Sequence, residues 1–433
     1  MSFSDLGLIE PILRSLETLG YTIPTLIQSQ AIPPIIEGRD VLGSAQTGTG
    51  KTAAFALPII HRLLVKGNPP KGHGRRIRAV VVVPTRELAV QVCESFLKYG
   101  RSATLRVIAV YGGVHQSLQV RALRHGVDIL IATPGRMVDL MEQGFIDLGR
   151  VETMVLDEAD MMFDMGFAPN LRHIMTHMPK ERQNLLFSAT MPAPIELLAR
   201  QILKDPARIE IIPEKTPLEI IDHRVSPVTK MAKPAALIAY LKSVTLERAI
   251  VFTRTKYGAD KVTMLLVRSG FSSEAIHGDK RQNVRQRTLN DFKTGRLQVL
   301  VATDIAARGI DVTGISHVIN FDIPLDPETY VHRVGRTGRA GAGGTALSLC
   351  QPEERRLLMS IERLIGKRIP VLPFEGSADS APSEGMDDGD RRDRDRGPRT
   401  MPSGRPFQPS RLPGKGGTRG PRPFSAGKRT ASK

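Results

Sequence analysis

Short runs of apolar residues, each ending in a polar turn, recur along the first 210 residues. The runs at 79–83, 128–132, 154–156 and 184–187 have the length of buried strands, and stretches with helical apolar spacing, such as 88–99 and 137–142, lie between them. A shorter run at 40–44 leads into a glycine-rich turn. Strands that alternate with helices predict a parallel sheet covered on both faces. The turns after such strands gather along one edge, where ligands bind.

The same alternation returns after a stretch rich in proline and charge at 205–217. Runs at 249–252, 299–302 and 317–321 predict strands, and the spacing at 257–268 and 353–367 predicts helices. We therefore expect two tandem doubly wound α/β domains, at 1–210 and 211–374. Residues 375–433 are rich in Gly, Pro, Ser, Asp and Arg with almost no aliphatic side chains, which predicts a disordered tail.

Composition narrows the class of protein. Hydrophobic residues make up 41% of the 433, enough for real cores, and no apolar run approaches the ~18 residues that span a bilayer. The first residues lack the pattern of a secretory signal, and two distant cysteines, Cys93 and Cys350, predict neither a disulfide framework nor a zinc site. We expect a cytoplasmic protein with no membrane contact.

Positive charge is concentrated at the C-terminal end. The net charge is +17, and residues 391–433, with 13 Lys and Arg against two acids, contribute +11 of it. The remaining 390 residues therefore carry only +6. This balance predicts an anionic partner, with a mildly basic main body and a strongly basic tail.

A glycine-rich turn follows the run at 40–44 and precedes a helical run. It reads Ala45-Gln46-Thr47-Gly48-Thr49-Gly50-Lys51-Thr52, with alanine where the usual phosphate-loop pattern has its first glycine. Gly48 and Gly50 let backbone N–H groups face a phosphate, Lys51 reaches the outer phosphates, and Thr52 offers a hydroxyl to Mg²⁺. The helix that follows adds its N-terminal dipole. The turn therefore predicts a phosphate-binding loop.

Carboxylates follow the run at 154–156 in the stretch Val155-Leu156-Asp157-Glu158-Ala159-Asp160. Alone, such a stretch is equally consistent with a solvated helix start, where acids favour the first turn. Mg²⁺ takes one or two protein carboxylates and keeps most of its waters. Together with the phosphate loop, the stretch predicts a nucleoside triphosphate with Mg²⁺ held between loop and acids.

Three side-chain patterns have competing interpretations. The arginines 333, 336 and 339 recur at a spacing of three, which argues against a core helix and leaves a solvated basic loop or groups that reach a triphosphate. Gln28 suits recognition of an adenine edge, although a surface glutamine is the plainer interpretation. His173 and His177 have the i, i+4 spacing of a zinc pair but no third ligand, so we do not predict a metal there.

Taken in order, these motifs resemble the DEAD-box ATP-dependent RNA helicases over roughly residues 1–370. The opening Met1-Ser2-Phe3 and the compact body are most similar to the bacterial RhlE-type subfamily. The resemblance implies two RecA-like domains, ATP and Mg²⁺ as cofactors, and RNA as the partner, bound as single strand or short duplex with little sequence preference. It also implies that RNA-stimulated hydrolysis opens and closes a cleft between the domains, separating short duplexes locally or remodelling RNA–protein complexes.

The resemblance also assigns roles to nucleotide-site residues. Phe3 would stack on adenine, with Tyr21 and Gln28 reading it, and Asp311 would contact the ribose. Asp157 would bind the metal through water, Glu158 would position or deprotonate the attacking water, and Arg336 and Arg339 would stabilise charge on the γ-phosphate. The phosphates and Mg²⁺ would lie on Ala45, Gln46, Thr47, Gly48, Thr49, Gly50, Lys51 and Thr52.

The implied RNA contacts are divided between the domains. The first domain would use Pro84, Thr85, Arg86, Gly113, Thr133, Pro134 and Arg136. The second would use Arg254, Gly278, Thr303 and Gly309. Ser188 and Thr190 would couple hydrolysis to strand separation.

Two rival functions share much of this pattern. A clamp that binds RNA without turnover would lack Lys51, Glu158 or the arginines, all of which are present. A DNA helicase of related fold would share the ATP motifs, and composition cannot report a contact to a 2′-hydroxyl. We expect a monomer or weak dimer, with protein partners possible through the tail, and the sequence leaves the RNA target and its pathway open.

Overall fold

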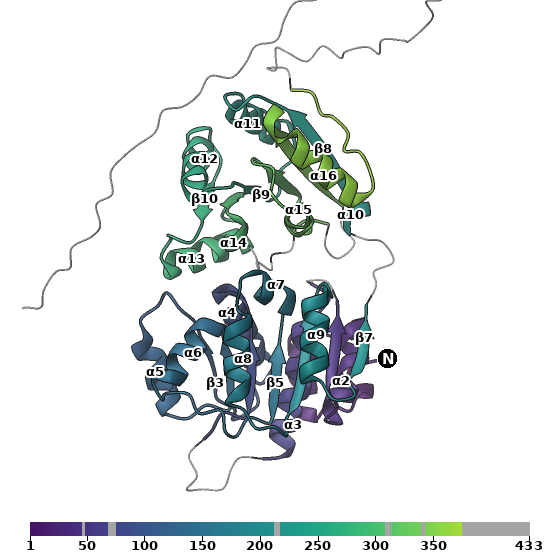
Figure 1. Ribbon diagram of the computed structural model, residues 1–433, viewed down its shortest axis with the longest axis vertical. Coiled ribbons are helices and arrows are strands. Elements are labelled where there is room, and N and C mark those ends of the chain that lie inside the picture. Colours follow the sequence, from purple (N-terminus) through teal and green to yellow (C-terminus); the bar gives the residue numbers. More distant parts are fainter. Residues whose placement is uncertain are drawn as a thin grey trace, which may run out of the picture. The chain divides into compact units, whose positions relative to one another are not determined.

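Two parallel sheets organise the chain in the computed structural model (Figure 1). The structure describes residues 1–45, 48–67, 75–211, 217–307, 312, 314–338 and 343–374. One sheet has seven strands in the order β3-β4-β2-β5-β6-β1-β7, and the other has six in the order β10-β11-β9-β12-β13-β8. We call each sheet with its covering helices the first and the second lobe.

The first lobe contains short strands, most of which are buried on both faces. Its strands are β1 (Val41–Ser44), β2 (Ala79–Val82), β3 (Val107–Val110), β4 (Ile129–Ala132), β5 (Thr153–Leu156), β6 (Gln183–Ser188) and β7 (Ala207–Glu210). Its helices are η1 (Ser4–Leu6), α1 (Glu10–Thr18), α2 (Leu26–Ile36), α3 (Lys51–Val65), α4 (Arg86–Tyr99), α5 (Gln116–Arg124), α6 (Pro134–Glu142), α7 (Ala159–Asp164), α8 (Ala168–Thr176) and α9 (Ala193–Ile202).

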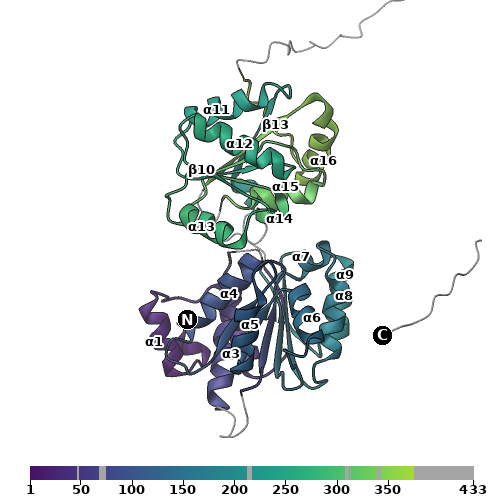
Figure 2. The ribbon, with the colours of Figure 1, turned by 90° about the vertical axis from the view of Figure 1, so that its left-hand side faces the viewer.

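Successive side chains of each strand enter two different cores. Val81 and Val155 pack with α1–α4 on one face of the sheet, whereas Val82 and Leu156 pack with α5–α9 on the other (Figure 2). Because both faces are covered, the strands carry nearly continuous aliphatic sequence instead of alternating with polar residues.

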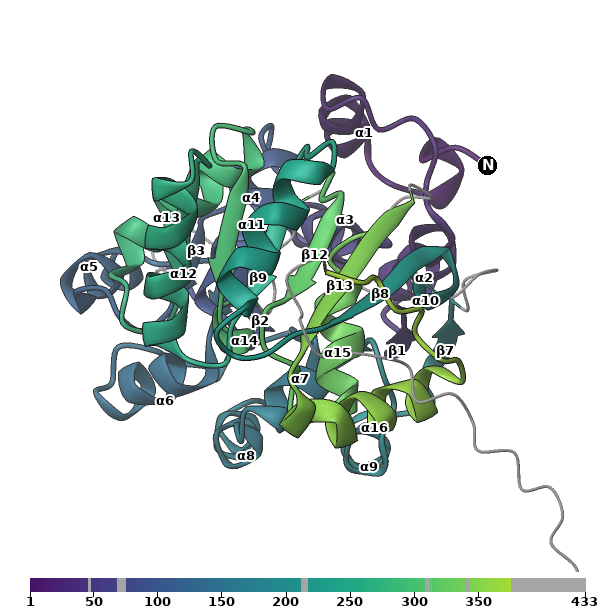
Figure 3. The same ribbon diagram turned by 90° about the horizontal axis from the view of Figure 1, so that it is seen from above.

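The second lobe follows the same plan. Its strands are β8 (Ile221–Pro227), β9 (Ala249–Phe252), β10 (Ser273–Ile276), β11 (Val299–Ala302), β12 (His317–Asn320) and β13 (Gly344–Cys350). Its helices are α10 (Pro217–Ile220), α11 (Lys233–Ser243), α12 (Lys256–Arg268), α13 (Gln282–Lys293), α14 (Asp304–Ala307), α15 (Pro327–Val334), η3 (Pro352–Glu354) and α16 (Arg355–Ile365). The core on one sheet face involves α11 and α12, and that on the other involves α13–α16 (Figure 3).

Strand order reveals that the two lobes share one topology. Reading β8 to β13 against β1 to β6 in chain order gives the same lateral order in both sheets, and β7 is the extra strand of the first lobe. The prediction of two doubly wound parallel-sheet domains is confirmed. Among the described residues no helix is both long and apolar enough to cross a membrane.

Candidate functional site

The phosphate-loop motif connects β1 to α3. Gly48 and Gly50 both have positive φ, 87° and 97°, which a residue with a side chain adopts only at a cost. Lys51 is the first residue of α3, is buried, and donates from Nζ to the carbonyl of Ala45 at 2.8 Å. Ala45 directly follows β1 and continues its ladder, with its N–H donating to the carbonyl of Ser188 at 3.1 Å, and its side chain is buried in the core.

Gln28 joins the N-terminal segment to this loop. Its Oε1 accepts from the backbone N–H of Thr25 at 3.0 Å, and its Nε2 donates to the carbonyl of Gly50 at 3.2 Å. A Cβ on Gly50 would lie 2.4 Å from that same nitrogen, so a larger residue would displace the end of the Gln28 side chain and would also be strained at φ 97°. The surface interpretation of Gln28 is wrong, because the side chain is only 2% exposed.

Two aromatic residues predicted near adenine lie in the same lobe. Phe3 is 4% exposed and belongs to the hydrophobic core on the α1–α4 face. Tyr21 is 40% exposed and meets the edge of the Tyr99 ring, with centroids 6.1 Å apart. Tyr21 therefore keeps an accessible ring, whereas Phe3 is packed inside.

The acidic stretch begins directly after β5. Asp157 is buried, and burial raises the pKa of its carboxyl to about 7, while the positive charge of Lys51 acts in the opposite direction. Lys51 of the phosphate loop and the Asp157 carboxylate therefore lie near enough to interact electrostatically. Glu158 has φ 53° and ψ 52°, a left-handed conformation that only a few per cent of non-glycine residues adopt.

The donor set at this place fits a hydrated divalent cation. Asp157 supplies a buried carboxylate whose pKa is raised by burial, and a cation beside it would favour the charged form. Oε2 of Glu158 is also buried, and among the described residues it has no hydrogen-bond partner. A buried acceptor without a partner is costly, so a metal-bound or reacting water would satisfy it.

Asp160, to which the sequence assigned no individual role, connects two of the predicted site residues. Its Oδ2 accepts from both the N–H and the hydroxyl of Thr190, each at 2.8 Å, and its own N–H donates to Ser188 Oγ at 3.1 Å. Asp160 thus fixes the segment after β6 to the acidic stretch. Its place as the third carboxylate of one short stretch was the available signal.

Polar turns after β2 and β4 lie side by side because these strands are neighbours. Thr85 precedes α4 and accepts the N–H of Leu88 with its hydroxyl, and Thr133 precedes α6 with Pro134 as the first helical residue. Two helix N-termini therefore point to one edge of the sheet, and such N-termini attract anions.

Arg86 lies against the backbone of the turn after β3. A Cβ on Gly113 would lie 1.8 Å from Nη1 of Arg86, and Gly113 has φ 77°. Arg136 on α6 lies within 3.4 Å of Asp139, and among the described residues its Nη1 is a buried donor without a partner. The structure thus brings predicted residues from three adjacent turns together at one edge.

The second lobe has a corresponding edge. Arg254, Gly278 and Thr303 follow β9, β10 and β11, which are adjacent in the sheet. Backbone hydrogen bonds join the strand ends, from Thr253 N to Ala302 O at 3.0 Å and from Thr303 N to Ile276 O at 3.4 Å. Arg254 and Gly278 are exposed.

Arg333 corrects one sequence interpretation. The spacing of the three arginines argued against a core helix, yet Arg333 lies in α15 with 2% exposure. Its guanidinium pairs with Asp304 at 2.5 and 2.8 Å and donates to Asn320 Oδ1 at 3.0 Å, so its charge is neutralised inside the lobe. Arg336 follows the helix and donates from Nε to the carbonyl of His332 at 3.2 Å.

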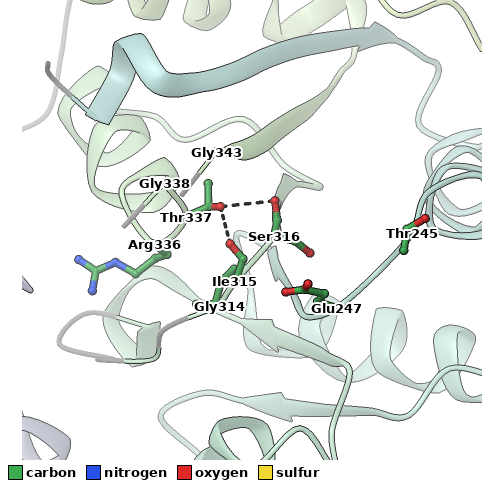
Figure 4. Close-up of a pocket in the computed structure, with 9 residues that line it drawn as sticks. All are labelled: Thr245, Glu247, Gly314, Ile315, Ser316, Arg336, Thr337, Gly338 and Gly343. Carbon is green, nitrogen blue, oxygen red and sulfur yellow. Dashed lines mark hydrogen bonds between the residues drawn. The ribbon is translucent and has the colours of Figure 1, made fainter. Parts of the chain in front are cut away.

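A cavity of about 270 Å³ lies beside the Arg336 segment. Its lining consists of Thr245, Glu247, Gly314, Ile315, Ser316, Arg336, Thr337, Gly338 and Gly343. Figure 4 shows the guanidinium of Arg336 pointing away from the other lining residues. The Thr337 hydroxyl donates to the carbonyl of Ile315 and lies 3.4 Å from that of Ser316, which anchors the arginine segment to the turn before β12.

Five predicted site residues lie outside the described residues: Gln46, Thr47, Gly309, Asp311 and Arg339. The two histidines with the spacing of a zinc pair are among the described residues. His173 and His177 lie at the end of α8 with ring centroids 4.6 Å apart, and Nδ1 of His177 is 2.9 Å from the carbonyl of His173. This contact is a local helix interaction.

Comparisons with known proteins match both lobes. The model of the DEAD/DEAH box helicase family matches residues 25–198, and that of the helicase conserved C-terminal domain matches residues 232–341. The ATP-dependent RNA helicase CshA of Listeria monocytogenes is 44% identical over 370 residues, which cover 86% of this chain and 70% of that protein. The ATP-dependent RNA helicase DeaD of Haemophilus influenzae is also 44% identical, over 85% of this chain and 59% of that protein.

Solved structures agree in fold. Dbp5 of S. cerevisiae bound to RNA and ADP BeF3 gives a TM-score of 0.74 at 29% identity, over 86% of this chain and 95% of that one. Mss116p bound to single-stranded RNA and AMP-PNP gives a TM-score of 0.76 at 28% identity, over 86% and 78%. Both neighbours were solved with RNA and a nucleotide or nucleotide analogue.

Proposed function

This chain belongs to the DEAD-box ATP-dependent RNA helicases, and from that premise we propose how its residues divide the work of hydrolysis and RNA binding. It is an ATP hydrolase built of two RecA-like lobes. The observation that carries the proposal is that Lys51, buried at the start of α3, lies near enough to the buried carboxyl of Asp157 for its charge to lower that pKa, and that the neighbouring Glu158 has a buried oxygen without a partner among the described residues.

For ATP, we assign the phosphates to the turn Ala45–Thr52, with Lys51 on the outer phosphates. Mg²⁺, when bound, would neutralise phosphate charge and be held by Thr52 and, through water, by Asp157. Glu158 orients or deprotonates the attacking water, and its buried free oxygen supports this role. Tyr21, Gln28 and Asp311 form the base and ribose side, and Phe3 keeps its predicted place beside the adenine although only 4% of it is exposed. Arg336 and Arg339 stabilise the transferred phosphoryl group.

For RNA, we assign the two polar strand edges to the backbone of a single strand. The helix N-termini after Thr85 and Thr133, with Arg86 and Arg136, would bind phosphates in the first lobe. Arg254, Gly278, Thr303 and Gly309 would do so in the second. Such contacts carry no base code, so sequence preference should be weak.

We propose that ATP and RNA together favour a closed arrangement, since each binds groups on both lobes. A strand bent across both edges no longer fits its duplex partner, so short duplexes separate locally. Asp160 links this to hydrolysis, because it ties Thr190 and Ser188 to the acidic stretch. Hydrolysis then reopens the lobes and releases RNA.

Several finer assignments belong to the same proposal. We place the domain boundaries at 1–210 and 211–374, with 375–433 as a basic tail that adds salt-sensitive RNA affinity and could bind protein partners. We further propose a cytoplasmic, monomeric or weakly dimeric enzyme of RhlE type, although the relatives compared above are CshA and DeaD.

Steady-state ATP hydrolysis tests the assignment of function. Rates are measured without nucleic acid, with single-stranded RNA and with DNA of matched sequence. We expect strong stimulation by RNA alone, and its loss in Glu158→Gln. The matched control is Glu181→Gln, whose side chain is 90% exposed on the same lobe and should leave the rate unchanged.

Two outcomes would contradict the proposal in different ways. Equal stimulation by DNA and RNA would make the chain a nucleic-acid-dependent ATPase without RNA selectivity. Tight RNA binding with no turnover in the wild-type chain would make it a clamp.

A further inference from the structure

The second lobe contains a buried lysine that neither hydrolysis nor RNA binding uses. Lys233 is 1% exposed, and its Nζ donates to the carbonyl of Phe321 at 2.6 Å and to Glu354 Oε2 at 2.9 Å. Asp322 Oδ1 lies 3.4 Å from the same nitrogen. Lysine is almost never fully buried unless it is paired, so this arrangement requires an explanation.

Topology gives Lys233 the position that Lys51 has in the first lobe. β8 corresponds to β1, and each strand is followed by a turn and a helix whose first residue is the lysine. β12 corresponds to β5, and a carboxylate follows each strand end, Asp322 after β12 and Asp157 after β5. Both lobes therefore have a lysine at the start of the helix and an aspartate just past the corresponding strand, with Asp322 one residue further from its strand end than Asp157.

The turns before the two lysines differ. The first-lobe turn has Gly48 and Gly50 in positive φ, where backbone N–H groups can face a phosphate. The second-lobe turn, 228–232, contains no glycine. It thus lacks the backbone conformation that would wrap an external phosphate.

A carboxylate of the chain itself supplies the anion instead. Glu354 belongs to η3, which follows β13, the counterpart of β6. Its Oε2 accepts from Lys233 and from the N–H of Gln351 at 3.2 Å, and its Oε1 accepts from Arg254 Nη2 at 2.8 Å. Both carboxylate oxygens are therefore bound by cations or N–H groups.

The same cluster fixes Arg254. The backbone N–H of Arg254 donates to Asp322 Oδ2 at 2.9 Å, and Nη2 donates to the carbonyl of Ile323 at 3.1 Å as well as to Glu354. The Arg254 side chain is nevertheless 44% exposed. Part of its guanidinium is hydrogen-bonded within the lobe, and the rest is open to solvent.

We infer that the second lobe retains an anion site of the phosphate-loop type, filled by the carboxylate of Glu354, and that the filled site positions Arg254 on the strand edge. Glu354 is a positioning residue, because it acts on RNA through Arg254. The inference of an anion site depends only on the contacts of Lys233. The expected effect on RNA binding also rests on the proposed function.

The first test opens the site. Glu354→Ala removes the carboxylate beside Lys233, and formate, a carboxylate of minimal size, should take its place. The thermal midpoint of the full chain is measured in chloride-free buffer against rising sodium formate, with gluconate at equal ionic strength as the bulky anion. We expect formate to raise the midpoint of Glu354→Ala saturably and more than that of the wild-type chain.

Two variants control this result. Glu354→Gln fills the same space with a neutral group and should not respond to formate beyond the wild-type chain. Lys233→Met/Glu354→Ala removes both charges, should fold even where Glu354→Ala does not, and should also be unresponsive. Equal formate shifts in every chain, or a double variant no more stable than Glu354→Ala, would overturn the anion site.

The second test reads out RNA. In Glu354→Ala the RNA concentration for half-maximal ATP hydrolysis should rise roughly three- to tenfold, as expected for weakening one charge-assisted contact, with little change in the rate at saturation. Formate should restore it. Arg254→Ala should show the same rise without restoration.

The two halves of the inference fail differently. If formate restores the thermal midpoint while neither variant changes the RNA requirement, the anion site stands and the RNA role of Arg254 is refuted. If Arg254→Ala changes the RNA requirement and Glu354→Ala does not, Glu354 does not position Arg254.

Discussion

The two lobes have the same strand order but use their corresponding lysines in opposite ways. Lys51 follows a turn with two left-handed glycines and faces a carboxylate whose pKa burial has raised. Lys233 follows a turn without glycine and binds a carboxylate of its own chain at 2.9 Å. The first arrangement is built to receive a ligand, and the second is complete without one.

This difference separates the features that both lobes share through their common fold from the features that leave one lobe open to a ligand. The positions of lysine and aspartate follow from strand order, so both lobes have them. Whether the site can accept a ligand depends on the conformation of the turn before the lysine. It also depends on whether a side chain such as Glu354, which follows β13, fills the site. The most informative experiments therefore change one lobe and use the other as its reference.

The largest expected effect is that of Lys51→Met on hydrolysis. Loss of a buried cation facing the transferred phosphate should slow ATP hydrolysis on the order of a thousandfold, as removal of one preorganised charge-stabilising donor does elsewhere. The control Lys98→Met removes an exposed lysine of the same lobe and should leave the rate unchanged. A rate within about tenfold of the wild-type rate would exclude Lys51 from the phosphate site.

The next largest effect is that of Lys233→Met on stability. This variant leaves Glu354 buried without its main cation, which should lower the free energy of unfolding of the second lobe by about 3 kcal/mol. Urea unfolding followed by labelling of Cys350 reports on this lobe, and labelling of Cys93 on the first. The prediction fails if Cys350 becomes reactive at the same urea concentration in Lys233→Met as in the wild-type chain; the Cys93 transition should be unchanged.

A smaller effect is expected at the first-lobe strand edge. Gly113→Ala places a Cβ against the Arg86 guanidinium and forces alanine into φ 77°, which should cost about 1–2 kcal/mol and raise the RNA requirement for hydrolysis. Gly112→Ala is the matched control, because its Cβ would lie 3.6 Å from Arg86, an ordinary contact. Equal effects of both variants would show that Arg86 is not the affected group.

The smallest expected effect concerns one cysteine thiol in each lobe, and here the two lobes should behave alike. Burial raises the pKa of the Cys93 thiol and of the Cys350 thiol to about 11 in each case. Because the thiolate reacts, only about a thousandth of each thiol is reactive at pH 8, and alkylation should accelerate about tenfold per pH unit below pH 11. Iodoacetamide labelling of the native chain between pH 7 and 9 measures this, with the urea-unfolded chain as control. A plateau near pH 9 would contradict it.

Much of this fold follows from local pattern. The apolar runs at 79–83, 128–132 and 299–302 are strands, because a doubly covered strand must be apolar on both faces. The edge strands β3 and β7 were not predicted. β7 carries Arg208 and Glu210 among its apolar residues, because two of its side chains are exposed. β3 is apolar at all four positions although it is mostly half-buried, and we did not identify it as a strand. β13 escaped prediction because its Gly-Thr-Ala-Leu-Ser-Leu-Cys sequence carries two polar residues.

The site was predictable where its residues are contiguous in sequence, as in the phosphate loop and the acidic stretch. Contacts across long separations were not, because no spacing rule says that Glu354 meets Lys233 or that Asp160 meets Thr190. Arg333 was misinterpreted for the same reason. An arginine can be buried when an acidic side chain pairs with it. The partner of Arg333 is Asp304 of α14, which the local sequence around Arg333 does not reveal.

The bond between Gln28 and Gly50 has a thermodynamic consequence. One carboxamide contacts both the segment at Thr25 and the carbonyl that opens α3, so any ligand that competes for that amide changes the free energy of the phosphate loop as well. Linkage is reciprocal. If a nucleobase hydrogen-bonds to this amide, base recognition and triphosphate binding become one coupled equilibrium. Selectivity between nucleotides would then appear as a difference in phosphate binding, far from the atoms that distinguish the bases.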